Sequence, residues 1–134
     1  MMWLLDTNII SFLLRGRSEV RARYDAIKGA ADTRFVLSPV VDYEIRRYLL
    51  LKGATRNLTQ YEALIAPWDK LPFDAAHWAD AATLWAERHR QGSPIADADL
   101  LIAVTAIQQH AVLVTNNTSH FQDLGLRLED WCQP

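Results

Sequence analysis

Hydrophobic positions form two kinds of pattern that alternate along the chain. Short, nearly unbroken apolar runs are typical of buried strands, whereas longer segments with apolar residues three and four positions apart predict amphipathic helices. The predicted strands cover residues 3–5, 34–38, 67–74, 111–115 and 126–128. The predicted helices cover residues 9–14, 18–28, 39–49, 58–66, 75–90 and 95–110. This alternation predicts an α/β fold in which helices cover both faces of a parallel sheet.

Several predicted helices carry residues that suit their position. Ser18 and Asp74 have side chains that cap a helix N-terminus, and Pro39 suits a first helical turn. We expect His77 and His89 on the helix surface, because the histidines lack the close pairing of a zinc site. The five tryptophans are expected in the core or in an interface rather than as platforms for nucleic-acid bases.

Length and composition indicate one globular domain spanning residues 1–134. The 134 residues are 50% hydrophobic and include one cysteine, Cys132, which excludes an intrachain disulfide and allows a reducing cytoplasmic setting. No apolar run reaches the roughly 18 to 20 residues that cross a membrane. Asp6 interrupts the first run before it reaches the length of a signal peptide. We therefore expect a soluble, cytoplasmic protein.

The overall charge argues against nucleic-acid binding through general basicity. The formal net charge is -2 and the sequence pI is about 6.0. Basic side chains do cluster within residues 15–23 and 46–56. Taken alone, these clusters are better explained as solvated helix faces.

The first apolar run ends abruptly at Asp6, which is followed by Thr7 and Asn8. A buried strand would deliver Asp6 to the C-terminal edge of the sheet, where open α/β folds bind their ligands. The same residue types also favour the N-cap of a helix. This stretch alone supports the ligand-binding and the capping interpretations equally.

Three more carboxylates are expected at this edge of the sheet. Asp97 and Asp99 open a predicted helix, and helix beginnings lie beside the C-terminal ends of parallel strands. Glu44 lies near the apolar side of helix 39–49, where an unpaired carboxylate is unfavourable. Capping and the helix dipole are sufficient to explain Asp97 and Asp99. Neither effect explains Glu44.

Carboxylates that converge repel one another, and a divalent cation relieves that repulsion. All-oxygen ligands favour Mg²⁺ or Mn²⁺ over Zn²⁺, and such a site would orient a water molecule for attack on a phosphodiester. The polar loop 115–119 leaves the same edge, so Thr115 and Asn117 are candidates to bind metal-bound water or phosphate. Turn formation explains this loop about as well. His120 follows it, and its role stays open.

Five segments, taken in order, resemble the motifs of the VapC family of PIN-domain ribonucleases. They are residues 5–8 (LDTN), 38–44 (SPVVDYE), 95–103 (IADADLLIA), 114–121 (VTNNTSHF) and 125–131 (GLRLEDW). The likeness covers essentially the whole chain, and the combination is more specific than any single segment. It implies a three-layer α/β/α PIN-like fold with a central, mainly parallel sheet of four to five strands.

The resemblance also implies the residues of a metal site. Asp6, Glu44 and Asp99 would be the catalytic acids and would bind Mg²⁺ or Mn²⁺. The auxiliary residues would be Asp97, Thr115, Asn117 and Asn8. Members of the family often have a further acid in the loop after the last long strand, where this chain has Asn116 and Asn117. This departure leaves a second metal position open.

The implied activity is metal-dependent endonucleolytic cleavage of RNA, commonly tRNA, by the toxin of a type II toxin–antitoxin system. A cognate VapB antitoxin would inhibit it from a groove near the acids, and a basic side chain inserted there would suit the negative charge. The resemblance further implies a homodimer within a larger complex that contacts DNA only through the antitoxin, with no membrane association.

Two alternatives stay open at this point. A phosphatase-like enzyme would use Asp6 as a nucleophile, but such enzymes usually carry a second aspartate two positions on, where this chain has Asn8. A PIN-like binding module with weakened catalysis is favoured if position 117 requires a carboxylate. A trapped aspartyl-phosphate would support the first alternative, and a lack of metal binding through Asp6 would support the second.

Overall fold

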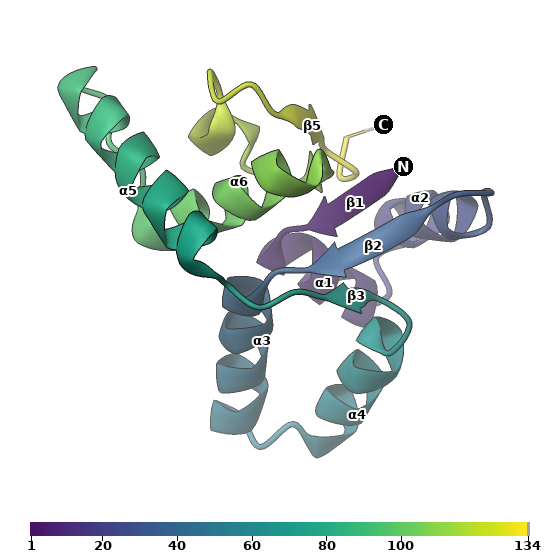
Figure 1. The fold of residues 1–134 in the computed structure, drawn as a ribbon. Coiled ribbons are helices and arrows are strands. Elements are labelled where there is room, and N and C mark those ends of the chain that lie inside the picture. The colour runs from purple at the N-terminus through teal and green to yellow at the C-terminus, as the bar shows by residue number, and fades with distance from the viewer. Residues whose placement is uncertain (134) are drawn as a thin grey trace.

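The computed structural model describes residues 1–133, and a sheet of parallel strands lies at its centre (Figure 1). The strands are β1 Met2–Leu5, β2 Arg34–Leu37, β3 Asp69–Lys70, β4 Val112–Val114 and β5 Arg127–Glu129, in the order β3-β2-β1-β4-β5. β1 is central: Trp3 lies opposite Phe35 of β2, and Leu5 lies opposite Val114 of β4. The sheet predicted from the apolar runs is confirmed.

Helices cover both faces of this sheet. They are α1 Thr7–Leu14, α2 Ser18–Lys28, α3 Pro39–Leu51, α4 Thr55–Ile65, α5 Ala75–Arg90 and α6 Asp97–Gln109, with a 3₁₀ helix η1 at Thr118–Phe121. Right-handed crossovers place helices on opposite faces when the chain reverses its direction across the sheet. Figure 1 shows α1 and α2 behind the strands, α5 and α6 together on the other side, and α3 beside α4 below. The predicted three-layer α/β/α fold is confirmed.

The three inner strands, β1, β2 and β4, form the core because they are largely buried, whereas the edge strands β3 and β5 are not. Leu4 of β1 and Leu113 of β4 are both fully buried. Trp3 packs against Trp131 near the C-terminus, with ring centroids 5.9 Å apart. Such burial explains why the strands appear in the sequence as continuous apolar runs rather than as alternating ones. Within residues 1–133, no helix is long and apolar enough to cross a membrane.

The tryptophans fall into two groups. Trp3, Trp68 and Trp131 are buried, as expected. Trp78 and Trp85, on the outer side of α5, are 55% and 44% exposed, so they are not core residues of the isolated chain. The apolar residues of α5 therefore do not all face inward, and Ala81 is the apolar residue of this helix that is buried.

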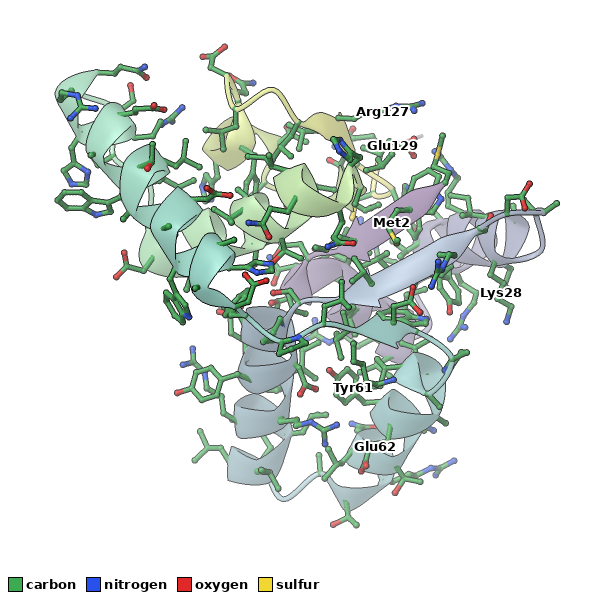
Figure 2. All side chains as sticks on the ribbon, viewed as in Figure 1. Met2, Lys28, Tyr61, Glu62, Arg127 and Glu129 are labelled. Atoms are coloured by element: carbon green, nitrogen blue, oxygen red, sulfur yellow. The ribbon has the colours of Figure 1, made fainter. Side chains whose placement is uncertain are left out.

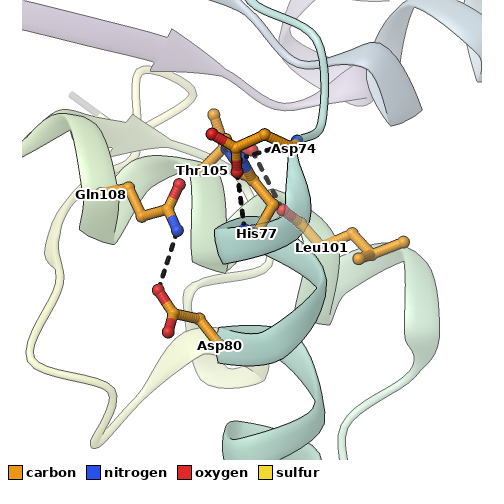
Figure 3. A network of polar contacts seen from close by, with 6 residues as sticks. All are labelled: Asp74, His77, Asp80, Leu101, Thr105 and Gln108. Carbon is orange, nitrogen blue, oxygen red and sulfur yellow. Dashed lines mark hydrogen bonds and ion pairs between the residues drawn. The ribbon is translucent and has the colours of Figure 1, made fainter.

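His77 is buried, so the prediction that it lies on the helix surface is wrong. Its backbone N–H donates to Asp74 Oδ1 over 2.9 Å, and its Nδ1 lies 2.9 Å from the same oxygen. Figure 3 shows these residues where α5 packs on α6, beside a second link in which Gln108 donates to Asp80 over 2.8 Å. The contact with Asp74 directs the His77 side chain toward the interior. Helical spacing alone does not predict this orientation. His89 is exposed, as expected.

The helix beginnings match two of the three sequence assignments. Asp74 caps α5, and Pro39 occupies the first turn of α3, where the Ser38 side chain accepts from the Val40 N–H. The assignment of Ser18 as an N-cap is wrong. Arg17 holds that position with extended backbone, and Ser18 is already helical, its hydroxyl donating to Glu19. The bounds of α2 match the predicted range 18–28, and only the capping role moves, from Ser18 to Arg17.

A partly buried polar contact joins α3 to α4. The Tyr61 hydroxyl donates to Asp42 Oδ1 over 2.7 Å, and Arg46 Nε donates to the same oxygen over 2.8 Å. Burial and the contact with Asp42 hold the pKa of Tyr61 well above its usual range. Figure 2 shows Tyr61 between the two helices, with Glu62 next to it on α4. This contact fixes α3, the helix that carries Glu44.

Candidate functional site

Asp6 lies at the point where β1 ends and α1 begins, and it is only 6% exposed. Its Oδ1 accepts from the Thr7 backbone N–H over 2.8 Å, which makes it the N-cap of α1. Its Oδ2 accepts from the Thr115 hydroxyl, also over 2.8 Å. Asp6 is therefore a cap and a buried carboxylate at the sheet edge at the same time, and the two interpretations of this residue do not exclude each other.

Thr115 reaches Asp6 because β4 is the neighbour of β1 in the sheet. It follows directly after Val114, which pairs with Leu5, so both side chains emerge at the C-terminal edge. The Thr115 hydroxyl also accepts from the Asn117 backbone N–H over 3.0 Å. Thr115 is fully buried and holds Asp6 and the following loop together.

Glu44 approaches the same place from α3. Its Oε1 accepts from the Thr7 hydroxyl over 2.8 Å, and its Oε2 lies 4.0 Å from an Arg47 nitrogen. The Glu44 side chain is 25% exposed, so the inward position expected from the helix pattern is confirmed. Thr7 was not among the predicted site residues, although a hydroxyl next to Asp6 was visible in the sequence. It links the first two acids of the site.

Asp99 and Asp97 both lie in the first turn of α6, but in different surroundings. The Asp99 side chain is 25% exposed, and its Oδ2 lies 3.2 Å from Nδ1 of His120. Asp97 is exposed and does not cap the helix, because Ala96 holds the N-cap position without a side-chain bond. The capping explanation of Asp97 is therefore wrong, whereas an acid in the first turn still favours the helix dipole.

His120 was left open by the sequence, and the structure brings it to Asp99. It belongs to η1, which follows the polar loop after β4. In the sequence, the only indication that His120 belongs to the site is its position just after the polar loop that follows β4. The contact spans 21 positions of sequence, from 99 to 120, and depends on how η1 folds back toward α6.

The asparagines take minor positions around the acids. Asn8 is exposed, and its Nδ2 donates to Asn116 Oδ1 over 3.2 Å, which connects α1 to the loop after β4. Asn117 joins the site through its backbone N–H, which donates to Thr115. The expected neighbourhood of Asn8, Thr115 and Asn117 is thus present, and their chemical roles stay predictions.

Burial raises the pKa of Asp6, because the charged form of a carboxyl loses its hydration there. Hydrogen bonds from Thr115 and Thr7 oppose this rise, and the negative charges of Asp99 and Glu44 add to it. These acids are therefore close enough to interact electrostatically. A cation in their midst would favour the ionised form of all three.

The donors fit a hard divalent cation. Carboxylate oxygens are the ligands that Mg²⁺ and Mn²⁺ prefer, and each Asp6 oxygen keeps a free lone pair beside the hydrogen bond it accepts. Among residues 1–133, no group of three or more histidine, cysteine, aspartate or glutamate side chains is arranged so that it could hold a metal ion by itself. A magnesium site of few protein ligands and several waters suits this arrangement better than a zinc cage.

The comparisons with known proteins agree on one family. The sequence model of the PIN domain matches residues 3–125. The tRNA(fMet)-specific endonuclease VapC of Shigella flexneri is 34% identical over 96% of this chain and 97% of that protein. Ribonuclease VapC1 of Haemophilus influenzae strain R2866 is 29% identical over 98% of both chains.

Solved structures give the same result for the fold. VapBC2 from Rickettsia felis, bound to a DNA fragment from its promoter, aligns with a TM-score of 0.86 and 26% identity over 98% of this chain and 99% of that one. VapBC-1 from nontypeable Haemophilus influenzae aligns with a TM-score of 0.80 and 28% identity over 99% and 100%. From its sequence and its fold alike, the chain belongs to the PIN-domain family and, within it, to the VapC proteins.

Proposed function

We propose that this chain is a metal-dependent endoribonuclease, the toxin of a VapBC-type toxin–antitoxin system, and that residues 1–134 form a single PIN domain. The observation that carries the proposal is the buried Asp6 carboxylate, held by Thr7 and Thr115, with Glu44 and Asp99 beside it. PIN-domain ribonucleases generally require a divalent metal. Buried acids that repel one another are suited to bind one.

In this proposal Asp6, Glu44 and Asp99 hold Mg²⁺ or Mn²⁺. The bound ion would lower the pKa of a water molecule and neutralise charge on the scissile phosphate. Thr115 and Thr7 keep Asp6 and Glu44 in place through hydroxyl groups that donate over 2.8 Å. Asp97, exposed in the first turn of α6, would act as an auxiliary by attracting the cation.

The proposed substrate is tRNA, because two relatives that share 34% and 30% of their residues with this chain are named tRNA(fMet)-specific endonucleases. The proposed inhibitor is a cognate VapB-type antitoxin, since the structural relatives are toxin–antitoxin complexes, some of them bound to DNA. DNA contact would come through the antitoxin. We place the protein in the cytoplasm as a homodimer that joins this larger complex.

The decisive experiment incubates purified chain, free of antitoxin, with total tRNA and Mg²⁺ or Mn²⁺. Asp6→Asn should reduce cleavage by about 10²–10³-fold, the loss typical for removing a central electrostatic group of an active site. Asparagine is also a good N-cap, so the fold should survive. Asp25→Asn, on the exposed side of α2, is the matched control and should cut normally.

Cleavage that persists in Asp6→Asn or in excess chelator would contradict the metal mechanism. A chain that binds no Mn²⁺ through Asp6 and cuts no RNA would instead be the weakened binding module. A covalent aspartyl-phosphate on Asp6 would identify a phosphatase.

A further inference from the structure

Arg88, in the last turn of α5, joins two loops that border the acidic site. Its Nε donates to the Ser93 backbone carbonyl over 2.8 Å, and its Nη1 donates to the Gln122 backbone carbonyl over 3.0 Å. The Ser93 N–H in turn donates to the Arg88 carbonyl over 2.9 Å. Arg88 is half-buried. We call these three bonds, which connect Arg88, Ser93 and Gln122, the Arg88 bridge.

The first arm of the Arg88 bridge fixes the start of α6. Residues 94–96 are all that separate Ser93 from this helix. Pro94 has a restricted φ, and Ile95 is buried in an apolar cluster with residues of α5 and α6. A short, stiff and well-packed segment therefore connects the anchored Ser93 to the first turn of α6, which carries Asp99.

The second arm fixes the end of η1. Gln122 follows η1 directly, and His120 lies two positions before it. Phe121, between them, is buried. Asp123 has a left-handed backbone with φ of 64°, a conformation that a residue other than glycine keeps only where surrounding contacts hold it. The bond from Arg88 to the preceding carbonyl is such a contact, so it anchors the segment that carries His120.

Asp99 and His120 meet between the two arms. Asp99 Oδ2 lies 3.2 Å from His120 Nδ1, and the two side chains are 25% and 53% exposed, so packing of the side chains restrains this contact only weakly. The position of the contact depends instead on the backbone segments on which the residues stand. The negative charge of Asp99 also acts on Asp6, so a shift of α6 would reach the centre of the site.

We propose that Arg88 is a positioning residue of the acidic site. By bridging the two loops it keeps Asp99 against His120 and thereby raises the affinity of the site for a divalent cation. A guanidinium suits this role, because its planar fork of donors bonds two acceptors in a fixed geometry, whereas an ammonium is a single point of charge. The inference rests on the proposed metal-dependent function and assigns a support to its site.

NMR of the metal-free, full-length chain tests the bridge directly. A nuclear Overhauser effect (NOE) between the ring protons of His120 and the β protons of Asp99 should be present in the wild type and several-fold weaker in Arg88→Gln. Arg88→Lys keeps the charge and a donor and should retain part of the NOE. Arg90→Gln is the matched control, since it removes the same charge from an exposed position in the same turn and should leave the NOE unchanged.

Calorimetric titration with Mn²⁺ tests the consequence for the cation. Arg88→Gln should lower the affinity about fivefold, less than the roughly 10–100-fold typical of a residue that contacts a metal ligand directly. Combining Arg88→Gln with His120→Ala should cost no more than His120→Ala alone, because both changes act on the same contact.

Three results would overturn the proposal. The first is an unchanged NOE in Arg88→Gln. The second is a double variant whose loss of Mn²⁺ affinity equals the product of the two single losses, since this would show that Arg88 and His120 act independently. The third is an equal loss in Arg90→Gln, which would assign the effect to charge alone. Circular dichroism verifies that each variant is folded, and Arg88→Lys takes the place of Arg88→Gln in the same cycle if the latter does not fold.

The measurements separate this proposal from the proposed function, because neither of them uses RNA. A chain that cuts tRNA while Arg88→Gln leaves the NOE and the Mn²⁺ affinity unchanged keeps the ribonuclease function and loses the bridge. A chain in which Arg88→Gln weakens both, although the wild type cuts no RNA, keeps the bridge and loses the function.

Discussion

Asp6 and His77 are both ionisable, nearly fully buried and placed at a helix N-terminus, yet they differ in what surrounds them. Both oxygens of Asp6 accept hydrogen bonds, and two further acids act on it. His77 contacts Asp74 through Nδ1, while its Nε2 is buried and has no hydrogen-bond partner among the atoms of residues 1–133.

The difference shows that burial of a polar group does not by itself mark a site. His77 is accounted for by the end of its own helix, because its hydrogen-bond partner lies three positions away. Asp6 is contacted or influenced by Glu44 of α3, by Asp99 of α6 and by Thr115 directly after β4, which are far apart in sequence. Convergence of like charges from separate elements therefore distinguishes the functional edge from a structural capping contact.

The largest effect is expected at Glu44. Glu44→Gln keeps an oxygen to accept from Thr7 but removes the charge, so RNA cleavage should fall by about 10²–10³-fold while the fold is retained. Glu62→Gln, on the exposed side of α4, should leave the cleavage rate within twofold. Cleavage is measured on labelled tRNA at saturating Mn²⁺. Equal rates in Glu44→Gln and wild type would remove Glu44 from the site.

His77→Ala should act on stability and not on chemistry. The substitution removes both the ring packed beneath α5 and the capping contact with Asp74, so unfolding in urea should require about 2–4 kcal/mol less. The cleavage rate of the folded fraction should not change. If the rate per folded molecule drops tenfold while stability is retained, His77 belongs to the catalytic machinery and the contrast with Asp6 fails.

His120→Ala should have an intermediate effect on metal binding. Loss of the group 3.2 Å from Asp99 frees that carboxylate, and affinity for Mn²⁺ should fall about tenfold in calorimetric titration. His120→Asn keeps a donor on a shorter side chain and should recover part of the affinity. His89→Ala, on the exposed side of α5, is the matched control. Unchanged Mn²⁺ affinity in His120→Ala would make the Asp99 contact incidental.

The smallest effect concerns the stability of metal-free protein. Burial raises the pKa of Asp6 in the folded state, so the unfolded chain loses this proton first as pH rises. Stability should therefore decline from near pH 3.8, the ordinary value, upward through the folded pKa. Asp6→Asn lacks this decline and should melt a few degrees higher than wild type at pH 7 in chelator.

Addition of Mg²⁺ should then stabilise the wild type and leave Asp6→Asn unaffected. Melting curves recorded with and without Mg²⁺ across pH 4–8 measure both effects. A metal-free Asp6→Asn variant that melts below the wild type at pH 7 would mean that the hydrogen bonds from Thr7 and Thr115 outweigh burial.

Much of the fold could be predicted because its signals are local. The apolar runs predicted β1, β2, β4 and β5, and helical spacing predicted α1 to α6 to within a few residues. The strand predicted over 67–74 is only two residues long, Asp69–Lys70. The predicted capping role of Ser18 and the predicted exposure of His77 were wrong because both depend on local backbone geometry. Arg17 takes the N-cap position of α2, and the contact with Asp74 holds His77 in the first turn of α5. Short-range packing of this kind is not visible in residue spacing.

The acids could be predicted because parallel strands share one C-terminal edge, which brings Asp6, Glu44 and Asp99 to the same side of the sheet. Their supporting contacts could not. The bond from Thr7 to Glu44 and the contact of His120 with Asp99 join elements whose relative rotation is fixed only by side-chain packing.

By itself, the sequence determined the order of strands and helices, the edge where the acids gather and the family to which the chain belongs. Hydrophobic periodicity and motif spacing carry that information along the chain. Only the tertiary structure decided that Asp6 is both a cap and a buried acid and that His77 is buried. These outcomes depend on contacts across many residues, which form only when the core is packed.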